Sequence, residues 1–322
     1  MMRLSSIVGV LVALVAALFI GSADAQEAYV LGGGMRDSGT GAESYTWQLE
    51  YMERFREHFA WSFSYLNEGH VPDHHRDGPV FQAWVRTDVL SDRLSLAAGL
   101  GPYGYFDTTP DSTGGSYRNG HGLGGVFSLS ATWRAYGPWL VQLRGNWVTV
   151  EHGNDNISAL VGIGYELGGT PAAGGRRLTE EPNRNEVTLS FGQTIMNSFN
   201  SDRSAAASLE YRRSLEEWPF EWTVTWLHEG ASDAGRGDGL MGQLWLARAF
   251  LGDRLSLGIG GGPYLVVDRS GTGDDERLVG VFSMTASYRL DRNWALRLTW
   301  SRVVTNRDSD SDVILCGLGY RF

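Results

Sequence analysis

Hydrophobic and polar residues alternate with a period of two along most of this chain. In residues 293–305 large apolar side chains alternate with small or polar ones, and residues 58–67 and 93–107 do the same. A period of two places successive side chains on opposite faces of a β-strand. A strand of about 9–11 residues with one apolar face is typical of a transmembrane β-barrel. The pattern predicts strands at 27–36, 44–54, 58–67, 79–89, 93–107, 123–135, 139–150, 157–167, 186–195, 204–213, 219–228, 240–250, 254–268, 278–290, 293–305 and 312–322.

The second half of the chain repeats the first. Residues 67–107 align without a gap on residues 228–268, with 17 of 41 positions identical, and residues 125–165 align on residues 280–320, with 14 of 41 identical. Each copy predicts the same series of eight strands, and the last strand ends in Phe322. Duplicated strands of period two with a terminal aromatic predict an all-β fold, a transmembrane antiparallel β-barrel of 16 strands in two eight-strand repeats.

The first 25 residues have the features of a secretory signal peptide. A basic residue precedes an apolar stretch, and Ala23, Asp24 and Ala25 form a small-x-small cleavage site. We expect the two barrel repeats to span residues 26–167 and 186–322. A Gly/Pro-rich linker at 168–185 would join them in the periplasm. These features predict export to the outer membrane of a Gram-negative bacterium.

The sequence leaves two ways of closing the strands. The lumen-facing positions are mostly Gly, Ser, Ala and Thr, with Glu50, Arg134 and Arg144 as candidates for ion pairs. Side chains just fill the interior of an eight-strand barrel, whereas such small residues would leave a 16-strand barrel open. The single terminal aromatic, in contrast, favours one barrel. We favour two small barrels, and a single 16-strand barrel acting as a porin-like passive channel is the alternative.

Composition narrows the expected partners. The formal net charge is −10, which argues against nucleic acid because proteins that bind it present a basic surface. The 12 Trp, 13 Tyr and 13 Phe suit aromatic girdles at the two membrane interfaces. Expected partners are outer-membrane lipid, lipopolysaccharide and the barrel-assembly machinery. Cys316 is the only cysteine, so no intrachain disulfide forms.

Histidines concentrate at one end of the first copy, in and near the predicted extracellular loops 68–78 and 108–122. Imidazole and carboxylate groups together suit a divalent metal such as Zn²⁺ or Cu²⁺, and they could also act as general acid and base. The spacing matches no established metal motif, and a solvated polar rim is the simpler interpretation. No other cofactor is expected, and catalytic residues are unknown. The candidate ligands are His70, His74, His75, His121 and His152, with Glu68, Asp73 and Asp77.

Several motifs carry a resemblance to a known family: residues 67–70, 74–78, 100–103, 305–308 and 317–322. Through them the mature chain resembles an uncharacterised proteobacterial outer-membrane β-barrel family with tandem eight-strand repeats, and more broadly the OmpA/OmpX-like barrels. The resemblance implies fold and location but no activity. The leading hypothesis is a structural or surface-binding barrel that uses its extracellular loops. The alternatives are the passive channel and a surface lipid-modifying enzyme that uses the histidine-rich rim.

Overall fold

The protein is described here from a computed structural model, and every regular element of its described residues is a β-strand. No helix in this part of the chain is long and apolar enough to span a membrane. The predicted signal peptide lies almost entirely outside the described residues, as does most of the predicted linker. The described residues are 25–71, 74–111, 117–151, 153–167, 184–215, 220–232, 235–270, 277–306 and 308–322.

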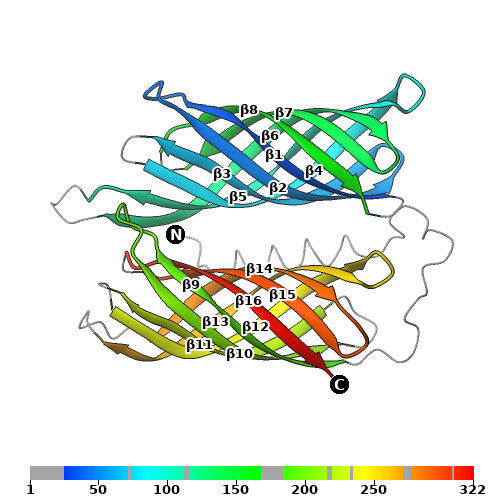
Figure 1. Ribbon diagram of the computed structural model, residues 1–322. Helices are drawn as coiled ribbons and strands as arrows, with labels where there is room; N and C mark the ends of the chain where they lie inside the picture. The colour runs from blue at the N-terminus through cyan, green and yellow to red at the C-terminus, as the bar shows by residue number, and fades with distance from the viewer. Residues whose placement is uncertain are drawn as a thin grey trace. The chain divides into compact units, whose positions relative to one another are not determined.

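The first eight strands form one closed antiparallel barrel (Figure 1). Its first and last strands pair from Glu27 opposite Glu166 to Asp37 opposite Asn156, which completes the ring of backbone hydrogen bonds. A closed ring leaves no unpaired strand edge. The strands are β1 (Ala25–Asp37), β2 (Glu43–Arg56), β3 (Phe59–Val71), β4 (His74–Val89), β5 (Leu94–Thr109), β6 (Arg118–Tyr136), β7 (Trp139–Val150) and β8 (Asn156–Glu166).

The remaining eight strands form a second closed barrel of the same kind. Its first and last strands pair from Glu186 opposite Arg321 to Met196 opposite Ser311. The strands are β9 (Asn185–Met196), β10 (Arg203–Ser214), β11 (Phe220–Ser232), β12 (Gly235–Phe250), β13 (Leu255–Ser270), β14 (Leu278–Arg289), β15 (Trp294–Val304) and β16 (Ser311–Arg321).

The prediction of two small barrels is confirmed, and the single 16-strand channel is wrong. A single barrel would require β8 to pair with β9, but each of these strands pairs with the first or last strand of its own copy. The physical reason lies in the lumens. Arginine and tryptophan side chains such as Arg144 and Trp84 are fully buried there, so an eight-strand ring is filled.

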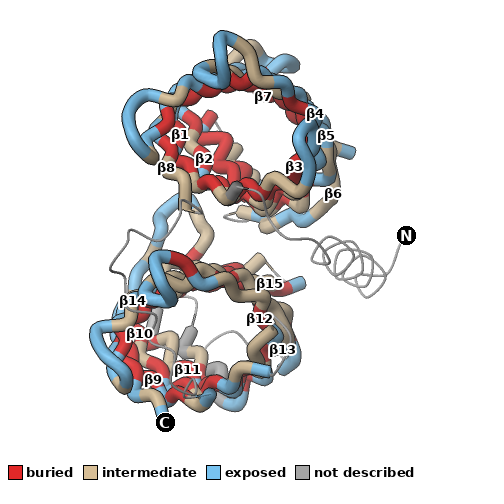
Figure 2. The backbone as a smooth tube through the Cα atoms, turned by 90° about the vertical axis from the view of Figure 1, so that its right-hand side faces the viewer, coloured by how far each residue is buried: buried red, intermediate tan, exposed pale blue. Residues whose placement is uncertain are grey.

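The outward faces of both barrels are apolar. Along β7, exposed and buried residues alternate, and the exposed set includes Leu143 at 61% relative accessibility. In the second barrel Phe191 on β9 is 62% exposed. Figure 2 shows each barrel as a closed ring of strands. Continuous apolar surface of this extent is unusual for a protein that faces water on all sides, and it matches a surface that faces lipid.

Aromatic residues lie on the outer surface near both ends of the first barrel. Trp133, Tyr136 and Trp139 are exposed at the end where β6 turns into β7, and Tyr45 and Trp147 are exposed toward the opposite end. Amphipathic rings at both limits of an apolar band are typical of barrels that cross a membrane. We call the first of these the short-turn end, where β2–β3, β4–β5 and β6–β7 connect, and the opposite one the loop end. The second barrel has the same two ends.

The predicted loop 68–78 is largely strand, which corrects the sequence-based boundaries. β3 continues to Val71 and β4 begins at His74, so the connection shrinks to residues 72 and 73, which lie outside the described residues. Strands of 13 and 16 residues exceed the ~9–11 residues that cross a bilayer. The hydrogen-bonded ladder therefore extends past the apolar band, and polar composition marks the protruding part of a strand as well as a loop.

Candidate functional site

The histidines predicted as metal ligands lie on strand ends and face different directions. His70 is exposed on β3 and stacks on Tyr45, with ring centroids 6.0 Å apart. The half-buried His74 on β4 places Nδ1 3.0 Å from Oδ1 of Asp107 on β5. His75 is the next residue, so its side chain points to the opposite face of β4. His121 is exposed near the start of β6, where its ring packs edge-on against Phe106.

Among the residues that the structure describes, no group of three or more His, Cys, Asp or Glu side chains is placed to hold a metal ion. Two of the candidates, Asp73 and His152, lie outside the described residues. The metal site and the lipid-modifying alternative that depends on the same histidine-rich rim both stay predictions.

Of the three carboxylates proposed to assist these histidines, Glu68 and Asp77 lie among the described residues, and both are buried. Glu68 is buried and accepts hydrogen bonds from Arg76 at 2.5 and 3.1 Å, from Tyr103 at 3.0 Å and from Asn156 at 2.7 Å. Asp77 is buried as well. Several donors already occupy the carboxylate oxygens of Glu68, so this side chain holds together a hydrogen-bonded group inside the barrel.

The second copy repeats this arrangement. The Tyr264 hydroxyl donates to Glu229 at 2.9 Å, as Tyr103 does to Glu68, and both tyrosines are fully buried. The residue after each glutamate is a glycine with positive φ, +72° at Gly69 and +77° at Gly230. Glycine adopts this conformation without the strain that a Cβ would add. The motif shared by the two copies therefore shapes the loop end of each barrel.

A buried ion pair crosses the middle of the first barrel. Both terminal nitrogens of Arg144 on β7 donate to the carboxylate of Glu50 on β2 at 2.6 Å, and neither side chain is exposed. The guanidinium lies over the ring of Trp84, 4.8 Å from its centroid. The Trp84 indole in turn donates to the Ser62 hydroxyl at 2.8 Å. Bidentate pairing and cation–π stacking compensate for the cost of burying the charge.

Polar side chains continue this network along the lumen. Gln48 donates to Ser64 at 2.8 Å and accepts from Asn146 at 3.2 Å. Asn146 also accepts from Ser128 at 2.7 Å, and Ser128 accepts from Gln82 at 2.9 Å. All five side chains are buried. Side chains from β2, β3, β4, β6 and β7 therefore meet across the lumen and fill its middle.

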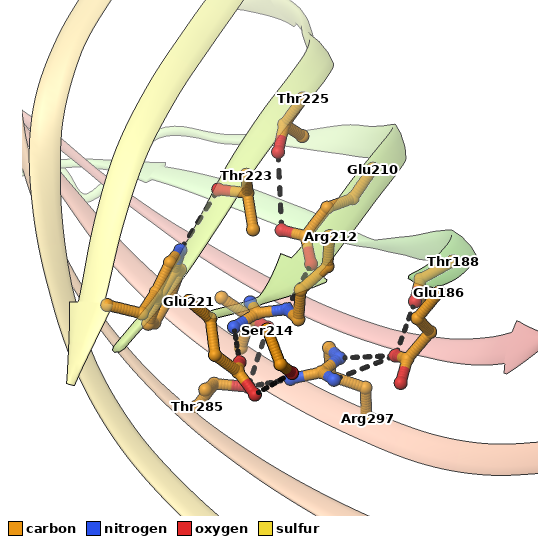
Figure 3. Close-up of polar contacts among 12 residues, drawn as sticks. Glu186, Thr188, Glu210, Arg212, Ser214, Glu221, Thr223, Thr225, Thr285 and Arg297 are labelled. Carbon is orange, nitrogen blue, oxygen red and sulfur yellow. Dashed lines mark hydrogen bonds and ion pairs between the residues drawn. The ribbon is translucent and has the colours of Figure 1, made fainter. Parts of the chain in front are cut away.

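The second barrel builds the corresponding ion pair from a different strand (Figure 3). Arg212 on β10 donates to Glu210 at 2.9 Å and to Glu221 at 2.7 Å. Its guanidinium lies 4.4 Å from the centroid of the Trp245 ring, and the indole donates to Thr223 at 2.9 Å. Glu and Trp are thus shared by the two copies, whereas the arginine comes from the seventh strand of the first barrel and the second strand of the other.

A further arginine pair lies near the short-turn end of the second barrel. Arg297 on β15 donates to Glu186 on β9 at 2.7 and 3.1 Å, and Thr188 donates to the same carboxylate at 3.0 Å (Figure 3). This pair was not predicted from the sequence. The sequence feature that could have indicated it is a difference between the copies, because Gln142 of the first copy aligns with Arg297 of the second.

No protein-family model matches the chain, and no curated protein sequence does. Solved structures with a similar fold include the N-terminal β-barrel domain of Pseudomonas aeruginosa OprF, at 11% identity and a TM-score of 0.35 over 44% of this chain and 96% of that one. Neisserial surface protein A gives 12% and 0.36, over 44% and 95%. The Yersinia pestis attachment invasion locus protein gives 10% and 0.33, over 44% and 98%. Such likenesses carry no argument about what this chain binds.

Proposed function

We propose that this chain is an outer-membrane protein that its two closed barrels anchor in the bilayer and that binds a partner at the cell surface through its loop ends. The exposed apolar band and the aromatic residues at its limits support the membrane location. The short-turn ends would face the periplasm, because tight turns lie on that side in bacterial barrels.

The observation that carries the proposal is the filled lumen of each barrel. Glu50 and Arg144 of the first barrel have no exposed side-chain surface, and Trp84 packs against them. In the second barrel Trp245 is fully buried beneath Arg212. A barrel with such an interior anchors the chain in the bilayer and presents its loop end at the surface, whereas a porin needs an open water channel.

Conductance and location together test this function. In planar lipid bilayers we expect the folded protein to give no stepwise current under conditions in which a general porin does. Retarded gel migration of unheated samples would verify folding. In cells the protein should remain with the outer-membrane fraction after carbonate washing. Sustained conductance steps would contradict filled lumens, and recovery as a soluble periplasmic species would contradict the membrane location.

Surface binding requires that the loop ends be reachable from outside. We expect a short epitope tag inserted between Pro72 and Asp73, in the segment that joins β3 to β4, to be labelled by antibody on intact cells. The same tag at Gly137, in the β6–β7 turn, should be labelled only after the outer membrane is permeabilised. The reverse pattern would overturn the assigned orientation.

A further inference from the structure

The short-turn end of the second barrel contains a cavity of about 180 Å³. One water molecule needs about 10–15 Å³ measured with a probe of its own size, so the cavity has room for a polyatomic ligand. Its wall combines strand ends with the β12–β13 turn. The charged side chains that line it are Arg184, Glu186, Arg212, Glu221, Asp253, Arg254, Arg289, Arg297 and Arg321.

This wall carries more positive than negative charge, six arginines against three carboxylates. Within the described part of the chain, Arg254 and Arg289 form no ion pair with a carboxylate. Nε of Arg289 and Nη2 of Arg212 are buried without a hydrogen-bond partner among the same residues. A buried donor without a partner is costly, and more so when it is charged. An acceptor that carries negative charge is therefore what the cavity lacks.

A cluster of buried apolar side chains occupies part of the loop-end half of the same lumen. Val281, Val303 and Leu315 lie there among further buried aliphatic side chains in one cluster. Glu229 and Ser311 lie in the same half, where the Ser311 hydroxyl donates to Glu229 at 3.0 Å. The polar groups of the loop end therefore lie at the opposite end of the lumen from the arginines of the cavity.

The arginine-rich cavity is specific to the second copy, as comparison with the first barrel shows. The matching cavity at its short-turn end is lined by Arg54 and Arg134 as its only arginines, together with four carboxylates. Ala249 takes the place of Asp88, and Arg321 follows the aligned block where Glu166 does in the first copy. The duplicated scaffold is therefore acidic at one short-turn end and basic at the other.

We propose that the cavity of the second barrel binds a phosphate-type oxyanion. A guanidinium group presents paired N–H donors that match two phosphate oxygens, and several such groups converge here. The chain has 27 arginines and no lysine, so every side chain with a permanent positive charge carries this paired-donor geometry. The hydroxyls of Ser256 and Ser287 add donors at the wall. The anion is either free inorganic phosphate or the headgroup of a phospholipid.

The test measures binding to full-length protein purified from membranes in detergent. Inorganic phosphate and dihexanoyl phosphatidylglycerol, kept below its micellar concentration, are titrated separately by calorimetry. We expect Arg254→Gln/Arg289→Gln to weaken binding about tenfold or more, since charge-assisted hydrogen bonds are lost. Arg93→Gln/Arg134→Gln, the aligned pair of the first barrel, is the matched control and should leave binding unchanged.

Each outcome discriminates. Binding of phosphate that is lost in the second-barrel variant identifies a free oxyanion, and binding of the lipid alone identifies a headgroup. Failure to bind either one overturns the site, as does equal binding by wild type and the second-barrel variant. Heat-modifiable gel migration checks that each variant is folded. The single variant Arg254→Gln, at an exposed turn residue, repeats the test if the double variant does not fold.

Discussion

At the residue scale, each copy pairs a buried lumen glutamate with an arginine, but the arginine lies at a different position in each copy. Glu50 and Glu210 each need a cation in the lumen, and Trp84 and Trp245 each supply a ring beneath it. The charge comes from Arg144 on β7 in one barrel. In the other it comes from the residue two positions after the glutamate on the same strand. The interaction is therefore maintained although the position of its cationic partner is not.

The different positions of the arginine predict that a second substitution can restore stability after the loss of Arg144. Arg144→Thr should lower the free energy of unfolding by about 3–5 kcal/mol, because Glu50 is left buried and unpaired. Met52 lies two residues after Glu50 on the same face of β2 and is buried in the lumen. Adding Met52→Arg to Arg144→Thr copies the second barrel and should recover most of the loss. Urea unfolding in lipid vesicles, followed by tryptophan fluorescence, measures both.

A control defines the scale of that effect. Arg134 and Glu166 pair at 2.9 Å at the short-turn end with side chains 25% and 30% exposed. Arg134→Gln should cost about 0–1 kcal/mol, since solvent screens the pair. A double variant Met52→Arg/Arg144→Thr no more stable than Arg144→Thr alone would show that lumen geometry, and not the charge alone, selects the strand.

At the scale of the elements, each strand has one apolar face that points outward and one face that points into the lumen. β7 alternates between exposed residues such as Leu143 and buried residues such as Gln142 and Arg144 along its length. The period of two in the sequence predicted this correctly. It did not predict where the strands end, because the ladder of hydrogen bonds continues past the apolar band and is independent of side-chain polarity.

The lipid-facing assignment predicts an asymmetric response to charge. Leu143→Arg, near the middle of β7, should destabilise the barrel in a bilayer by about 2–4 kcal/mol. Tyr136→Arg, at an exposed position of the short-turn end, should cost about 0–1 kcal/mol, as expected near a membrane interface. Guanidinium titration of vesicle-inserted protein compares them. Equal costs at the two positions would mean that the outer face of β7 does not contact the bilayer core.

At the scale of the whole molecule, each barrel closes on itself and holds its own polar network. The ladder that closes the first ring joins β1 to β8, and the one that closes the second joins β9 to β16. Residues 26–167 and 184–322, expressed separately, should therefore each refold into detergent micelles as a β-barrel with heat-modifiable migration. Circular dichroism verifies strand content. Aggregation of both halves under conditions that refold the full chain would show that they depend on each other.

The sequence by itself determined the strand period, the duplication and the outward apolar faces, because these depend on the local alternation of side chains. It also identified Glu50 and Arg144 as candidates for pairing. Only the tertiary structure decided that there are two rings, since closure depends on which strands pair over long range. It likewise decided the partner of each lumen arginine and gathered the arginines of the short-turn end of the second barrel. Those residues are far apart in the chain, and only ring closure brings them to one cavity.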